Sequence, residues 1–82
     1  MRLMNETIYN YLNNSHHMTI NDLLDTTNKL TEIVEHRHLD SQTRDQLQSQ
    51  VDTDLANLWL FEDGPEIPQI TKNLKQLQKQ LL

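Results

Sequence analysis

The sequence predicts an all-α protein, a single domain built as a small antiparallel four-helix bundle. Glycine and proline punctuate β-hairpins at regular intervals, but here they form one cluster, Gly64, Pro65 and Pro68. Leucine, glutamine, lysine and glutamate are plentiful and favour helices. Apolar side chains recur at helical spacing in four separate segments.

The size and composition of the chain suit one small domain in a reducing compartment. The 82 residues leave no room for two domains, and the absence of cysteine excludes disulfides and thiolate metal sites. The mean hydropathy of −0.74 would suit a disordered chain, but the regular apolar spacing argues against disorder. No apolar run approaches a membrane span or a signal peptide, so we expect a soluble, cytoplasmic protein.

The first two helices are expected at about residues 3–13 and 19–37. Asn13 to Ser15 compete for backbone hydrogen bonds and end the first helix. Thr19 is placed to cap the second helix by accepting from the backbone N–H of Asp22. The apolar stripes are Met4, Ile8, Tyr11 and Leu12 in the first helix, and Ile20, Leu23, Leu24, Thr27, Leu30 and Val34 in the second.

The last two helices are expected at about residues 41–62 and 68–81. Asp40 or Ser41 caps the third, Gly64 can adopt the left-handed conformation that ends it, and Pro68 opens the fourth. The stripes are Leu47, Val51, Leu55, Leu58 and Trp59 in the third helix, and Ile67, Ile70, Leu74, Leu77 and Leu81 in the fourth. Short links make sequential antiparallel packing the simplest topology.

Histidines and carboxylates form no convincing catalytic or metal-binding pattern. His36 and His38 lie two apart, which on a helix turns them about 160° away from each other. Glu35 and His38 copy a Glu-x-x-His element, but a di-iron bundle needs two such elements and further carboxylates. Asp52 and Asp54 also diverge on a helix. We therefore expect no metal, no cofactor and no enzymatic activity.

The aromatic segment at the end of the third helix is a candidate contact surface. Leu58, Trp59, Leu60 and Phe61 are four consecutive bulky apolar residues, and a helix cannot bury all four against one neighbour. Either neighbouring helices sandwich them, or part of the segment stays exposed to a partner. Trp59 and Phe61 are the predicted partner-binding residues of this segment.

Charge is segregated along the chain. Residues 1–66 hold twelve acidic and four basic side chains, whereas residues 67–82 hold Lys72, Lys75 and Lys79 and no acid. The three lysines line one side of the last helix. They either form a solvated face that complements the acidic bundle, or bind an acidic partner or anionic lipid. The net charge of −5 argues against direct nucleic-acid binding.

Roughly residues 20–82 resemble the small helical immunity proteins that lactic-acid bacteria make against their own class IIa-type bacteriocins. The similarity consists of a helix starting Asn21-Asp22-Leu23-Leu24, a Leu-row helix, the break Glu62-Asp63-Gly64-Pro65-Glu66, and an Ile/Leu heptad helix. The resemblance implies an antiparallel four-helix bundle in the bacterial cytosol. It also implies protection of the producer cell by acting with the bacteriocin's receptor, a membrane sugar transporter.

A shorter segment resembles the haemolysin-modulating nucleoid adaptors of enteric bacteria. It comprises Asp52, Leu55, Ala56 and Leu58, followed by Ile67-Pro68. This second resemblance implies a compact helical protein that binds a DNA-binding partner. We therefore expect a non-catalytic protein-interaction module, with immunity as the first hypothesis and regulatory adaptor as the alternative. The predicted partner-binding residues are Trp59, Phe61, Lys72, Lys75 and Lys79.

Overall fold

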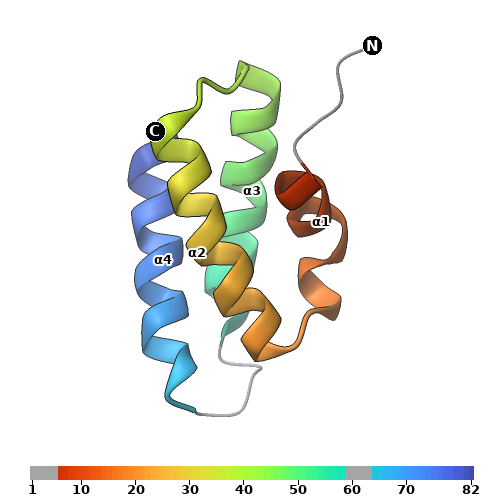
Figure 1. Ribbon diagram of the computed structural model, residues 1–82, viewed down its shortest axis with the longest axis vertical. Coiled ribbons are helices and arrows are strands. Elements are labelled where there is room, and N and C mark those ends of the chain that lie inside the picture. Colours follow the sequence, from red (N-terminus) through yellow and green to blue (C-terminus); the bar gives the residue numbers. More distant parts are fainter. Residues whose placement is uncertain (1–5, 59–63) are drawn as a thin grey trace.

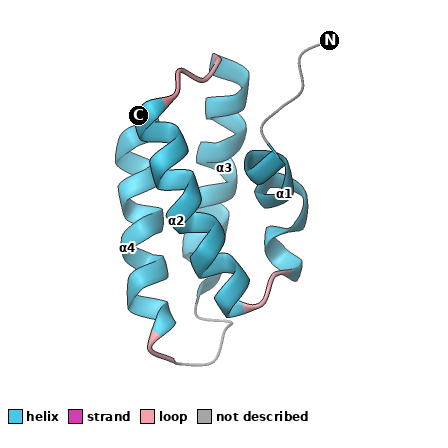
Figure 2. Ribbon diagram, viewed as in Figure 1, coloured by secondary structure: helices cyan, strands magenta, loops and turns pink. Residues whose placement is uncertain are grey.

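The computed structural model describes residues 6–58 and 64–82, and this part of the chain is helical without strands (Figures 1 and 2). The predicted all-α, four-helix bundle is therefore confirmed. The elements are α1 (Glu6–Asn14), a single turn of 3₁₀ helix η1 (Ser15–His17), α2 (Ile20–His36), α3 (Ser41–Asn57) and α4 (Glu66–Leu81).

Two helices begin at the side-chain caps that the sequence indicates. Thr19 Oγ1 accepts the backbone N–H of Asp22 at 3.2 Å, before the first turn of α2. Asp40 Oδ1 accepts the backbone N–H of Thr43 at 3.1 Å, before the first turn of α3. Each cap satisfies a donor that the helix itself leaves unpaired, which stabilises the helix start by about 1 kcal/mol.

The boundaries around the third link differ from the prediction. The structure gives α3 as Ser41–Asn57, and residues 59–62 of the predicted helix lie outside the described part. The left-handed conformation predicted for Gly64 is wrong, because this residue has no positive φ, and its carbonyl accepts the N–H of Ile67 at 3.2 Å. α4 starts at Glu66, two residues before Pro68. Pro68 still falls in the first turn, where its missing N–H removes no helical hydrogen bond.

The first link is more ordered than the predicted loop. Asn14, expected to lie beyond the first helix, is the last residue of α1, and η1 follows directly. Ser15 is buried at the start of η1, so this turn packs against the bundle. Of the predicted helix at 3–13, residues 3–5 lie outside the described part.

α4 occupies the centre of the packing. Consecutive helices run in opposite directions, but α2 and α4 run in the same direction and share the most extensive contact between described elements (Figure 1). α3 packs antiparallel on the other flank of α4, and α2 and α3 contact each other less than either contacts α4. The predicted sequential antiparallel packing therefore leaves out the largest contact of the bundle, which is the parallel one between α2 and α4. α4 takes this place because it carries the largest set of buried side chains.

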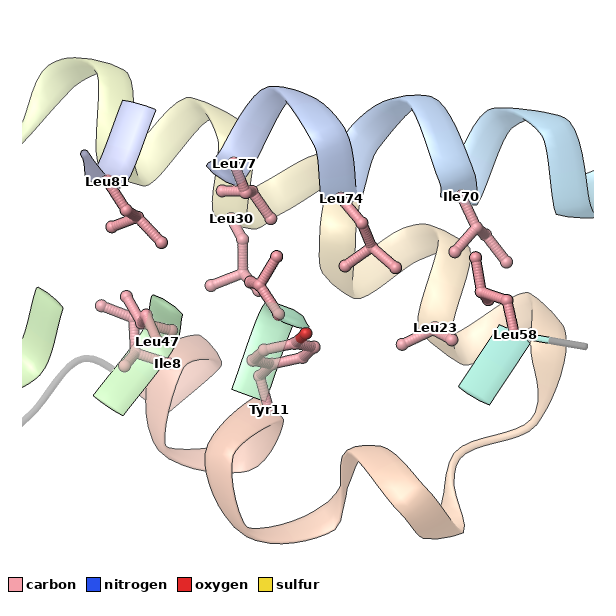
Figure 3. Packing of buried hydrophobic residues seen from close by; sticks show 11 residues of the cluster. Ile8, Tyr11, Leu23, Leu30, Leu47, Leu58, Ile70, Leu74, Leu77 and Leu81 are labelled. Atoms are coloured by element: carbon pink, nitrogen blue, oxygen red, sulfur yellow. The ribbon is translucent and has the colours of Figure 1, made fainter. Parts of the chain in front are cut away.

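The core runs along the length of α4. The fully or almost fully buried apolar side chains are Ile8, Tyr11, Leu23, Leu30, Leu47, Val51, Leu58, Ile70, Leu74, Leu77 and Leu81 (Figure 3). Fully burying a large aliphatic side chain contributes about 1.5–3 kcal/mol, so four such residues fix α4 firmly. α1 contributes only Ile8 and Tyr11 to this cluster.

Candidate interaction surface

The lysines of α4 lie on the side of the helix that faces away from the core. Lys72, Lys75 and Lys79 are all exposed. On the opposite side of the helix, Leu74 and Leu77 are buried against α2 and α3. Because a helix repeats every 3.6 residues, the burial of one face forces the lysines onto the opposite one. Seven residues separate the outer two, so the positive charges span about 10 Å along the helix.

No described acid neutralises these lysines. In residues 6–58 and 64–82, the ion pair formed is between Lys29 and Asp25, which lie one turn apart on α2 with Nζ and Oδ2 at 3.1 Å. The acidic side chains of the described part therefore form no ion pair with the α4 lysines. We call Lys72, Lys75 and Lys79 the lysine face. It presents three unpaired cations to solvent.

The aromatic candidates cannot be placed beside the lysine face. Trp59 and Phe61 lie outside the described residues, as does Leu60. Leu58, the residue before them, is 7% exposed and belongs to the core. The partner-binding role of Trp59 and Phe61 stays a prediction.

A buried amide in α4 was missed by the sequence pattern. Asn73 is 5% exposed and donates to Thr27 Oγ1 at 3.1 Å and to Asn28 Oδ1 at 2.7 Å, both on α2. Its carbonyl oxygen accepts from Gln69 Nε2 at 3.1 Å. All of its polar groups thus have partners, and the amide fixes the register between the two parallel helices. The sequence feature that indicates its burial is its position at the edge of the apolar stripe, three residues after Ile70 and four before Leu77.

A second polar cluster joins α1 and η1 to α3. Asp54 Oδ1 accepts from Gln50 Nε2 at 2.9 Å and from the hydroxyl of buried Ser15 at 3.5 Å. The hydroxyl of Tyr11 and the carboxylate of Asp54 are neighbours, and the Tyr11 hydroxyl and Asp54 Oδ2 are both buried without a hydrogen bond of ordinary geometry. Burial raises the pKa of Tyr11 well above its ordinary value of 10.0, and the nearby Asp54 carboxylate raises this pKa further.

The carboxylates do not converge into an acid–base pair. Asp52 is exposed and accepts from Gln78 of α4 at 2.7 Å, whereas Asp54 faces α1, so the predicted divergence is confirmed. His36 and His38 are exposed, as expected. Within the described ranges, no three His, Asp or Glu side chains come together as metal ligands would.

One open groove lies between α1 and α3. It measures about 620 Å³ and is lined by Tyr9, Leu12 and Asn13 of α1 and by Asp45, Gln46, Ser49 and Gln50 of α3. Tyr9 is 56% exposed at its edge. The lining mixes apolar and polar side chains, and Asp45 is the one charged residue among them.

No family model, no curated protein and no solved structure matches this chain. None of the described helices has both the length and the apolar character needed to cross a membrane.

Proposed function

We propose that this chain is a non-catalytic interaction protein that binds an acidic surface of a protein partner through the lysine face of α4. The observation that carries the proposal is the combination of exposure and lack of ion pairs at Lys72, Lys75 and Lys79. Unpaired cations on a rigid helix attract and orient an acidic partner, and they do so on a bundle whose other surfaces repel it.

The burial of α4 favours a protein partner over a lipid surface. A helix that lies in a membrane interface must insert its apolar side, but Ile70, Leu74 and Leu77 are at most 1% exposed. Lysines alone contribute about 1 kcal/mol each near an anionic membrane, and the acidic remainder of the chain opposes that attraction. Peripheral membrane contact would therefore be made through a membrane protein, as in a receptor complex.

Within this class, a cytosolic bacteriocin immunity protein is the specific function that we propose. The supporting features are the four-helix bundle, the Ile/Leu heptad of α4, and the basic face available to a receptor protein. Trp59 and Phe61 remain predicted partner-binding residues outside the described part. The experiment expresses the chain in bacteria sensitive to a panel of class IIa-type peptides. A gain in survival against at least one peptide is expected, and no gain against any would contradict the immunity function.

The acidic face of α3 favours a second candidate, a regulatory adaptor for a nucleoid or DNA-binding protein. Asp45 and Asp52 are exposed there, and carboxylates suit a basic partner. This function predicts that the tagged chain co-purifies with a DNA-binding protein from its own cells. The complex should be lost in Asp45→Lys/Asp52→Lys and retained when the lysine face is reversed. The opposite pattern would reject the adaptor and support binding through the lysine face.

A further inference from the structure

The open groove between α1 and α3 presents an aromatic ring and an aliphatic side chain next to each other. Its volume of about 620 Å³ is that of sites that hold a small ligand or one long side chain. Leu12 is partly buried in its lining, and Tyr9, one turn earlier on α1, is 56% exposed. Because more than half of Tyr9 faces solvent, a ligand in the groove can stack on its ring.

The charge of this groove is negative. Asp45 of α3 is the one charged residue in its lining, and within the described ranges it forms no ion pair. A second carboxylate, Glu6, is exposed one turn before Tyr9 on the same face of α1. α1 and α3 run in the same direction, and Ile8 lies beside Leu47 (Figures 1 and 3). Glu6 and Asp45 each precede one of these two residues by two positions, so both carboxylates lie at the same end of the groove.

The polar groups that the groove offers to a ligand are mostly acceptors. Asn13 Nδ2 donates to the backbone carbonyl of Tyr9 at 2.8 Å, and Gln50 Nε2 donates to Asp54 Oδ1 at 2.9 Å. Both amides therefore use their NH₂ group within the protein, which leaves their oxygens as acceptors. The ionised carboxylate of Asp45 is also an acceptor and has no donor. A ligand that fits this lining is a cation with several N–H donors.

The geometry points to a binding site for an arginine side chain from a basic segment of a partner protein. The guanidinium group has five donors and no acceptor, and its plane stacks on the ring of Tyr9. It forms two parallel hydrogen bonds to the carboxylate of Asp45, and its aliphatic stem packs on Leu12. A lysine has the same charge but neither the plane nor the paired donors, so the site prefers arginine. Because the site belongs to α1 and α3, it does not depend on the lysine face of α4.

The test titrates the isotope-labelled full chain with two capped peptides of equal charge, hexa-arginine and hexa-lysine. Chemical-shift changes of the backbone amides locate the site, and calorimetry gives the affinity. Hexa-arginine should shift the amides of residues 9–13 and 45–50 most, and should bind about fivefold tighter than hexa-lysine. Asp45→Asn keeps the shape of the side chain and removes its charge, so it should weaken hexa-arginine binding by about tenfold.

Matched variants separate the groove from the general acidity of the chain. Glu35→Gln removes one exposed carboxylate of α2, the same change in net charge as Asp45→Asn, and should bind hexa-arginine within about twofold of wild type. Tyr9→Phe keeps the ring and should retain the preference for arginine over lysine, whereas Tyr9→Leu should lose it.

Four results would overturn the inference. They are no binding of hexa-arginine by the wild type, shift changes centred outside the two segments, equal affinity of the wild type for both peptides, and equal weakening by Asp45→Asn and Glu35→Gln. The exchanged side chains are all exposed, so the variants should fold, and their own amide spectra show whether they do.

Discussion

Removing the buried amide of Asn73 should destabilise the bundle by a modest and calculable amount. Asn73→Ala deletes two donated hydrogen bonds, of 3.1 Å to Thr27 and 2.7 Å to Asn28, and one accepted from Gln69. Asn28 and Gln69 are exposed, so water can replace the lost partner of each. The Thr27 hydroxyl keeps its bond to the carbonyl of Leu23 at 2.9 Å.

The net loss is therefore about one buried hydrogen bond, near 1 kcal/mol, together with the packing of the removed side-chain atoms. We expect the free energy of unfolding to fall by about 1–2 kcal/mol, since no strongly buried group is left unpaired. For a domain of this size, each kcal/mol lowers the melting temperature by about 4–8 °C. Asn73→Leu fills the space with apolar atoms and should lose less than Asn73→Ala.

The assay is urea unfolding followed by circular dichroism, with Gln76→Ala as the control. Gln76 is exposed on the same helix, and its replacement should change stability by less than about 0.5 kcal/mol. Equal stability of Asn73→Ala and Gln76→Ala would show that the amide cluster does not hold α2 and α4 together. A loss above about 4 kcal/mol would equally refute the reasoning, because it requires a buried group with no alternative partner.

Three further predictions concern single features of the fold. Thr19→Ala removes the cap of α2 and should lower the free energy of unfolding, measured by thermal unfolding, by about 1 kcal/mol. Thr19→Ser keeps the capping hydroxyl and should lower it little, so equal stability of the two variants would contradict the role of the cap. Tyr11→Phe removes a buried hydroxyl whose neighbour is the Asp54 carboxylate, so its stability at neutral pH should fall by at most about 1 kcal/mol, whereas Tyr11→Ala should lose about 3–5 kcal/mol. Because the pKa of Tyr11 is raised above its unfolded value of 10.0, the neutral phenol favours folding fully below that pH. Wild type should lose stability relative to Tyr11→Phe above pH 10, by up to about 1.4 kcal/mol per pH unit, and parallel pH profiles would contradict this.

The sequence predicts most of the fold because each helix carries its own periodic apolar stripe and, in two cases, its own cap. Thr19 and Asp40 can be assigned from neighbouring residues alone, since an N-cap needs only a side-chain oxygen and a donor three residues on. The spacing of apolar residues in α4 likewise predicts which of its side chains are buried, namely Ile70, Leu74, Leu77 and Leu81.

The parts that sequence reasoning misses depend on contacts between distant residues. Asn73 is polar, so an apolar periodicity passes over it, and its burial depends on Thr27 being opposite it on another helix. The near-contact of Tyr11 with Asp54 likewise joins residues far apart in the chain. The parallel pairing of α2 with α4 arises because α4 buries more side chains than any other described helix. The number of side chains that each helix buries is known only once the helices are packed together.

The lysine face was predicted from charge segregation, and the structure confirms its exposure but leaves its partner as a proposal. Helical spacing places Lys72, Lys75 and Lys79 on one side, which the described residues bear out. Spacing alone could not decide whether the bundle's own acids neutralise them. In the described part these lysines form no such ion pairs, and an external acidic partner stays a proposal.

Reversing the lysine face tests the central claim most directly. Lys72→Glu/Lys75→Glu/Lys79→Glu should fold, because all three side chains are exposed, and its stability should stay within about 1–2 kcal/mol of wild type. Lys29→Glu is the control, since Lys29 is an exposed lysine on α2. The measurement is survival of sensitive cells that express each protein at equal level and are exposed to the peptide against which wild type protects. The proposed mode of action predicts that the triple variant loses protection and that Lys29→Glu keeps it. Undiminished protection by a folded triple variant would contradict it.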